Sequence, residues 1–184
     1  PSRVSILTGL PPEDTGVYHN EAAWGNYRFE HQLMTLPGVF ADQGYGTANF
    51  GKVHVPKALQ TWQHSEGAGA RMSELFANMD LSELKAVQLP GAPLIVGGHY
   101  PGDRSYPPEE VTENALSWLS QQESPYFARV SYLQPHTPVL PPPPYDSMYE
   151  TVDFPDAINE NGRVSNFERC FAGTFRANTM QPAE

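Results

Sequence analysis

Apolar residues recur along this chain at the spacing of amphipathic helices and, elsewhere, in short runs typical of buried strands. Five segments have the helical spacing and are predicted to be helices: a short one beginning at Pro1, then 36–43, 72–87, 108–121 and 166–178. The segment 108–121 is the most strongly indicated, because prolines open it, Glu109 and Glu110 fill its first turn, and its apolar residues form one stripe. Gly44 is the expected C-terminal stop of the second helix.

Three short apolar runs predict strands: 47–50, 94–96 and 126–133. The last is nearly continuous, which is typical of the interior of a sheet. The stretches 10–34 and 56–69 are rich in Pro, Gly and polar residues, so we expect loops there. Strands that alternate with helices predict an α/β fold with a largely parallel sheet flanked by helices. A chain of 184 residues suits one domain.

The charge balance excludes one class of partner. Eleven Lys and Arg residues against 21 Asp and Glu residues give a formal charge of -10, and no basic stripe is present. Nucleic acid is therefore not an expected partner. An anionic substrate would have to be bound by a local group of positive side chains. No apolar run is long enough to span a membrane, and the single Cys170 cannot form an internal disulfide.

Two basic residues follow the strand predicted at 47–50. Lys52 and His54 are two positions apart, so an extended backbone places both side chains on one side. Open α/β sheets bind ligands at the carboxyl ends of their strands. Arg3 lies in the first turn of a helix, where a positive charge is unfavourable unless an anion is near. The alternative for each residue is a solvated surface side chain.

His136 follows the strand predicted at 126–133, within the segment Gln134-Pro135-His136-Thr137-Pro138. Taken alone, it is better explained as a histidine held in a rigid proline turn. The remaining histidines show no metal-ligand spacing: His19, His31, His64 and His99. Five aspartates are scattered, form no recognisable pair of ligands, and are more simply explained as solvated loop or helix carboxylates: Asp42, Asp103, Asp146, Asp153 and Asp156.

Three segments, in this order, resemble motifs of the type I sulfatases, the formylglycine-dependent, arylsulfatase-like members of the alkaline phosphatase superfamily. Residues 1–9, Pro-Ser-Arg-Val-Ser-Ile-Leu-Thr-Gly, resemble the end of the motif Cys/Ser-x-Pro-Ser-Arg-x-x-x-Leu-Thr-Gly. Residues 44–54 are similar to Gly-Tyr-x-Thr-x-x-x-Gly-Lys-x-His, with Val53 where many members have Trp. Residues 130–138 are similar to the family's strand followed by Pro-His-x-Pro. Together the matches cover roughly residues 1–150, and residues 151–184 add nothing diagnostic.

The resemblance implies an alkaline-phosphatase-like catalytic domain, of which residues 1–184 form part. It implies hydrolysis of a small-molecule or saccharide sulfate ester to an alcohol and sulfate. The implied catalytic residues are Arg3, Lys52, His54 and His136, of which Lys52 and His136 also bind the sulfate. The family's nucleophile, formylglycine, falls two positions before Pro1, so we expect this chain to be an inactive fragment that works with the remainder of a longer protein.

The family also binds a calcium ion through paired Asp and Asp-Asn ligands, and hard oxygen ligands of this kind suit calcium. Neither pair is recognisable here, so the ligands are expected outside this chain. Within the family, an iduronate-sulfatase-like branch and the phosphonate monoester hydrolases both share features with this sequence. A phosphonate or phosphate ester hydrolase of the same fold, and a truncated anion-binding domain without catalysis, remain alternatives. A periplasmic, secreted or lysosomal-type compartment is plausible for the family.

Overall fold

The computed structural model describes residues 1–19, 29, 31–67, 85–89, 92–100, 105–136 and 138–153. The chain divides into two compact units. The first comprises Pro1–Asn78 and Ser105–Leu133, and the second comprises Met79–Arg104 and Gln134–Glu184. Within the described residues, no helix is both long enough and apolar enough to cross a membrane.

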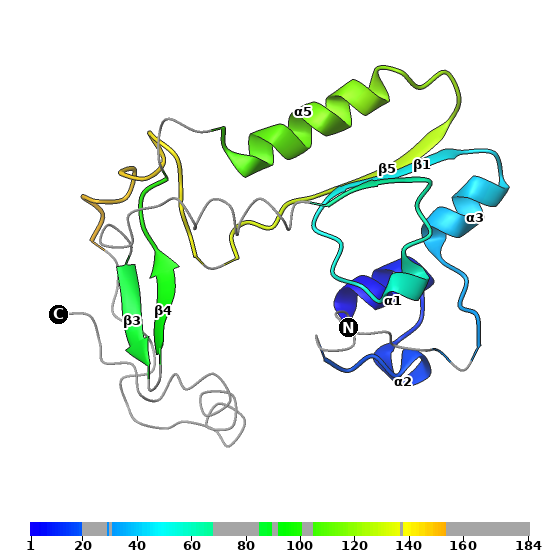
Figure 1. Cartoon of the computed structure of the whole chain (residues 1–184), viewed down its shortest axis with the longest axis horizontal. Coiled ribbons are helices and arrows are strands. Elements are labelled where there is room, and N and C mark those ends of the chain that lie inside the picture. The colour runs from blue at the N-terminus through cyan, green and yellow to red at the C-terminus, as the bar shows by residue number, and fades with distance from the viewer. Residues whose placement is uncertain are drawn as a thin grey trace. The chain divides into compact units, whose positions relative to one another are not determined.

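A three-stranded parallel sheet forms the centre of the first unit (Figure 1). The strand β1 (Gly46–Gly51) lies between β2 (His64–Glu66) and β5 (Tyr126–Ser131). In this register Asn49 of β1 lies beside Arg129 of β5. From the second to the last residue, β1 is buried, as expected for a central strand. The predicted α/β class with a parallel sheet is therefore confirmed.

Helices cover both faces of this sheet. The helix α5 (Pro107–Leu119) lies over one face, where Ala115 packs with Ala48 and Phe50. On the other face lie the helices α1 (Ser2–Thr8), α2 (Pro12–Thr15) and α3 (Leu36–Asp42) (Figure 1). The core on that face consists of Val4, Leu7, Val17, Val55, Leu59 and Trp62. The sheet therefore separates two hydrophobic layers, with β1 buried between them. The interior position predicted for 126–133 is not seen among the described residues, where β5 lies at an edge of the sheet and is partly exposed.

Local signals in the sequence account for the starts of α5 and α3. Pro107 and Pro108 begin α5, with Glu109 and Glu110 in its first turn. In α3, the Thr35 hydroxyl accepts a hydrogen bond from the Gly38 amide at 3.2 Å, an N-terminal cap. The helices predicted at the chain start, at 36–43 and at 108–121 are confirmed.

The prediction of a loop at 56–69 is wrong in part. This stretch contains a 3-10 helix η2 (Lys57–Leu59) and the strand β2. The strand has the sequence His-Ser-Glu, which carries no apolar pattern, and it is held by pairing with β1. Gln63 and Thr47 anchor its start, because each backbone amide donates to the other residue's side-chain oxygen, at 2.8 and 3.2 Å. Likewise, the loop predicted at 10–34 contains the single-turn helix α2.

In the second unit, β3 (Lys85–Leu89) and β4 (Ala92–Gly97) form an antiparallel pair. The strand predicted at 94–96 is confirmed within β4. The helix predicted at 72–87 is wrong at its end, where β3 begins at Lys85, because pairing with β4 overrides local helix propensity there. The rest of that segment, and the helix predicted at 166–178, lie outside the described residues.

Candidate active site

The backbone turns sharply where β1 ends, and this turn carries Lys52 and His54. Gly51 has φ 85°, a left-handed conformation that glycine adopts without steric cost. The Lys52 amide then donates to the Ser131 carbonyl at 2.6 Å, so the end of β1 stays joined to the end of β5. His54 has φ 48°, which is uncommon for a residue with a side chain. Such outliers concentrate at functional sites.

Arg3 reaches this turn from α1. Its Nη1 donates to the Ser131 hydroxyl at 2.8 Å and to the Lys52 carbonyl at 3.3 Å. Val4 and Leu7 bury the other side of α1 in the core, which fixes the helix and therefore the start of the Arg3 side chain. Two predicted site residues, Arg3 and Lys52, are thus in direct contact although they lie 49 positions apart in the sequence.

A third basic residue, Arg129, lies beside them and was not among the predicted site residues. It comes from the middle of β5, within a run that is otherwise largely apolar. Its Nε donates to the Asn49 side-chain oxygen at 2.7 Å, and its Nη2 donates to the Lys52 carbonyl at 3.3 Å. Its guanidinium carbon lies 5.3 Å from the centre of the Trp62 ring. The sequence did carry a signal that could have identified Arg129 as a site residue. Arginine is rarely buried without a partner, so an arginine within an apolar strand indicates a specific contact.

These three side chains form a local concentration of positive charge. Burial, and then repulsion by Arg3, lowers the pKa of Lys52 below its ordinary value. The same two causes, in the same order, lower the pKa of Arg129 from its ordinary value to about 10. Among the residues that the structure describes, no carboxylate forms an ion pair with any of the three. The local charge therefore favours an anion over a cation at this point of the chain.

The two predicted histidines belong to different units. His54 follows Lys52 in the first unit, partly buried, with its Nε2 atom inaccessible to solvent. His136 belongs to the second unit, in the turn after Pro135, where it is exposed. The assignment of His136 to the same site as Lys52 thus stays a prediction from the sequence.

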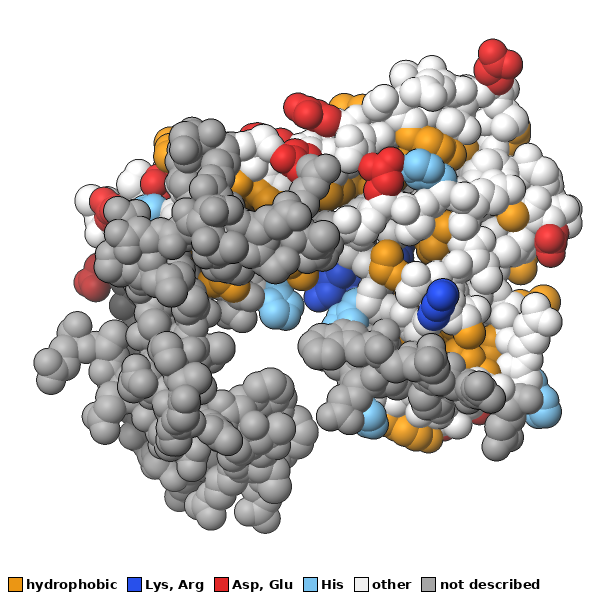
Figure 2. Space-filling model, viewed as in Figure 1, with side chains coloured by type: hydrophobic (Ala, Val, Ile, Leu, Met, Phe, Trp, Pro, Cys, Tyr) orange, Lys and Arg blue, Asp and Glu red, His pale blue; other side chains and the backbone are white. Residues whose placement is uncertain are grey.

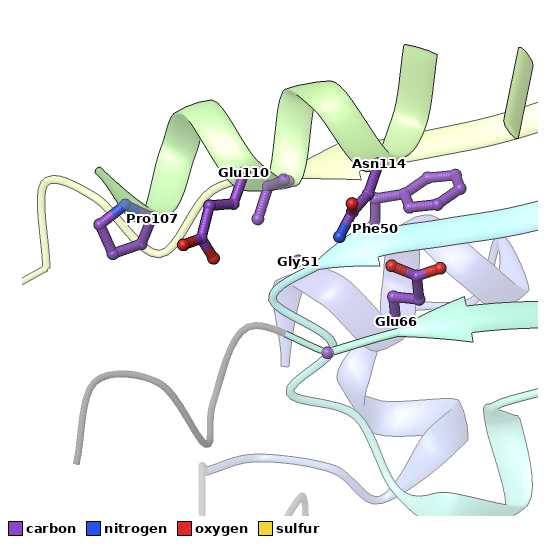
Figure 3. Close-up of a pocket in the computed structure, with 8 residues that line it drawn as sticks. Phe50, Gly51, Glu66, Pro107, Glu110 and Asn114 are labelled. Atoms are coloured by element: carbon purple, nitrogen blue, oxygen red, sulfur yellow. The ribbon is translucent and has the colours of Figure 1, made fainter. Parts of the chain in front are cut away.

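A cavity of about 270 Å³ lies on the α5 side of the sheet, at the carboxyl end of β1 (Figure 3). Glu110 and Asn114 of α5 point into it from one side and Glu66 of β2 from the other (Figure 3). Phe50 and Gly51 also line it. Two carboxylates would repel a sulfate or phosphate group, so this cavity does not suit the anion that the three basic residues favour.

No metal site is assigned among the described residues, which contain no group of three or more His, Cys, Asp or Glu side chains able to hold an ion. The described part of the chain therefore does not fit the family's calcium ion. In the second unit, His99 Nδ1 lies 3.3 Å from an Asp146 carboxylate oxygen, which accounts for that histidine without a metal.

On the face seen in Figure 2, acidic side chains are spread over the described surface and few Lys or Arg side chains are visible.

Several curated sulfatases are similar to this chain in sequence. Human iduronate 2-sulfatase is 27% identical over 176 residues, which cover 81% of this chain and 28% of the human protein. The Delta 4,5-hexuronate-2-O-sulfatase of Bacteroides thetaiotaomicron is 33% identical over 66 residues, which cover 36% of this chain and 14% of that protein. The chain thus spans less than a third of the length of either relative.

Solved structures are similar in fold. One, in complex with its substrate D-glucosamine-2-N,6-O-disulfate, superimposes with a TM-score of 0.56 at 20% identity, covering 86% of this chain and 29% of that chain. The phosphonate monoester hydrolase from Silicibacter pomeroyi superimposes with a TM-score of 0.55 at 20% identity, covering 84% of this chain and 35% of that chain. The family model described as Sulfatase matches residues 1–176. This chain therefore belongs to the sulfatase family.

Proposed function

We propose that the protein containing this chain hydrolyses an organic sulfate ester to an alcohol and inorganic sulfate. The observation that carries the proposal is the meeting of Arg3 and Lys52 at the end of β1, where the described carboxylates offer no counter-charge. A sulfate ester is anionic, and its hydrolysis places further charge on the sulfuryl and leaving oxygens. Fixed positive groups at that point stabilise the transition state because they need no reorganisation.

Each residue has a distinct role in this proposal. Arg3 is held at two acceptors, so its guanidinium stays in place to face one sulfuryl oxygen. Lys52 provides a second positive charge and binds the sulfate. His54 and His136 transfer protons to and from the reacting oxygens, because histidine titrates near neutral pH.

The nucleophile in this proposal is the family's formylglycine, placed two positions before Pro1, which supplies the oxygen that attacks sulfur. The calcium ion of the family is proposed to bind through residues outside this chain. What these residues contribute is binding of the anion, its orientation and the movement of protons.

A sulfated saccharide is the proposed substrate class. The support is in the names of the relatives, which include an iduronate 2-sulfatase, a hexuronate-2-O-sulfatase and an N-acetylglucosamine-6-O-sulfatase. Phosphonate and phosphate esters are the competing substrates, because the same positive groups would bind them. The similarity to phosphonate monoester hydrolases concerns the fold alone.

The test compares matched esters of one phenol. The protein is expressed with its natural flanking sequence and assayed with nitrophenyl sulfate, nitrophenyl phosphate and a nitrophenyl phosphonate. We expect the sulfate to be turned over fastest and Lys52→Ala to lower kcat by about 100-fold or more. Lys57→Ala is the control, because Lys57 is exposed on η2. Faster turnover of the phosphonate, or an active Lys52→Ala variant, would contradict the proposal.

A further inference from the structure

The backbone of Lys52 is restrained at both its amide and its carbonyl. Its amide donates to the Ser131 carbonyl at 2.6 Å. Its carbonyl accepts from two different guanidinium groups, Arg3 Nη1 and Arg129 Nη2, each at 3.3 Å. Charged hydrogen bonds are about twice as strong as neutral ones, so two such donors restrain this carbonyl more than neutral donors would.

Arg129 is itself held in a fixed orientation. It lies directly beside Asn49 in the register of the sheet, and its Nε donates to the Asn49 side-chain oxygen. Asn49 is fully buried, so it gives Arg129 a rigid partner. The Trp62 ring lies against the guanidinium on another side, and Trp62 is itself stacked on Phe127 at 5.4 Å. The position of Arg129 is therefore set by the core and not by solvent.

This arrangement is electrostatically unfavourable by itself. Arg3 and Arg129 carry like charges and approach the same oxygen, and the described carboxylates neutralise neither. A neutral side chain in the same place would avoid the repulsion. The described partners of Arg129 are the neutral groups of Asn49, Lys52 and Trp62, so a counter-ion within the described residues does not explain its presence.

We propose that Arg129 is a positioning residue of the anion site, which acts through the Lys52 carbonyl to hold the turn 51–54 in the conformation that presents Lys52. The proposal rests on the function proposed above for that turn. Arg129 works with Arg3: one guanidinium approaches from β5 and the other from α1, and together they fix one peptide. Its positive charge also adds to the field that attracts the anion.

The geometry requires arginine rather than lysine at this position. The planar guanidinium reaches Asn49 through Nε and Lys52 through Nη2 at the same time, while its face lies against Trp62. The lysine ammonium is a compact charge on a flexible stem and cannot make these contacts together. Arg129→Lys keeps the positive charge and removes the planar guanidinium with its several donors, whereas Arg129→Gln removes both. Comparing the two variants therefore distinguishes the effect of the hydrogen bonds from the effect of the charge.

The first measurement reports position without activity. Amide hydrogen exchange is followed at Lys52 and at Ala48, which lies in the middle of β1, in the protein with its natural flanking sequence. We expect exchange at Lys52 to accelerate by about 10-fold or more in Arg129→Lys, with Ala48 unchanged. Unchanged exchange at Lys52 in a folded variant would overturn the proposal. Equal acceleration at both amides would also overturn it, because Arg129 would then be a general stabilising residue.

The second measurement connects position to turnover. We expect both variants to lose about 10- to 100-fold in kcat, because small displacements of a binding group are costly. Arg129→Gln should also bind inorganic sulfate more weakly than Arg129→Lys does. Full kcat in Arg129→Lys would show that charge alone matters and would overturn the positioning role. If the wild-type protein hydrolyses no sulfate ester, the proposed function fails, while the exchange at Lys52 still decides the role of Arg129.

Discussion

Gly51 and Ser131 approach each other so closely that only a glycine fits at position 51. A Cβ atom built on Gly51 would lie 2.2 Å from the Ser131 carbonyl oxygen and 3.2 Å from a methyl group of Val111. Real side chains essentially never show a contact as short as 2.2 Å, and the obstructing atom belongs to backbone. The close approach is what lets the next amide, that of Lys52, bond to Ser131. The end of β1 and the presentation of Lys52 therefore depend on this glycine.

Gly51→Ala should destabilise the protein and displace Lys52. We expect the free energy of unfolding to fall by about 2 to 3 kcal/mol, because the new methyl group clashes with backbone and φ 85° is strained for alanine. Gly67→Ala is the matched control, since among the described residues no atom beyond its chain neighbours lies within 4 Å of the position that a Cβ would take there, and it should change stability by less than about 0.5 kcal/mol. Urea denaturation of both variants measures the difference. Equal stabilities would contradict the close contact.

The pKa of Lys52 should lie below 10.5 and should respond to Arg3. Burial and the charge of Arg3 both lower it, so Arg3→Gln, which removes the second cause, should raise the pKa of Lys52. Bound sulfate should raise it as well, because an anion favours the protonated amine. Sulfate binding should therefore weaken as pH rises through this pKa, at a lower pH than for an ordinary lysine. An NMR titration of labelled lysine side chains measures each value, and a pKa of Lys52 that ignores both changes would contradict this electrostatic account.

Because the His54 backbone is left-handed, replacing His54 with glycine should abolish activity without lowering stability. We expect His54→Gly to be at least as stable as wild type and His54→Ala to be about 1 kcal/mol less stable than His54→Gly, because only glycine adopts φ 48° without cost. Both variants should lose activity, since both lack the imidazole. Thermal unfolding and the aryl sulfate assay together test this. If His54→Gly retained turnover, His54 would have no role in proton transfer.

Truncating Phe50, which lies between α5 and the sheet, should lower the free energy of unfolding more than truncating a residue on the exposed side of α5. Phe50 is 1% exposed and packs with Ala48, Ala115 and Trp118. Phe50→Ala should lower the free energy of unfolding by about 3 to 5 kcal/mol through lost burial and the cavity it leaves. Leu116→Ala, on the exposed side of α5 at 60% exposure, should cost less than about 1 kcal/mol. Comparable losses in the two variants would contradict this arrangement of α5.

Elements whose signals are local could be predicted from the sequence. Pro107 and Pro108 with two glutamates start α5, and Thr35 caps α3, because these effects act between residues a few positions apart. The motif segments likewise predicted Arg3 and Lys52 as site residues, and the family was recognisable from them. None of this requires knowledge of how distant segments pair.

Features that depend on pairing between distant segments could not be predicted in this way and became visible in the folded chain. The polar strand β2 forms because β1 offers it a partner, and β3 replaces a predicted helix because β4 lies beside it. Arg129 belongs to the anion site because the parallel register places it next to Asn49, 80 positions away, and this brings its guanidinium to the Lys52 carbonyl. Pattern along a chain records which side of a strand a residue occupies, whereas the neighbour across the sheet is set by long-range hydrogen bonding and packing.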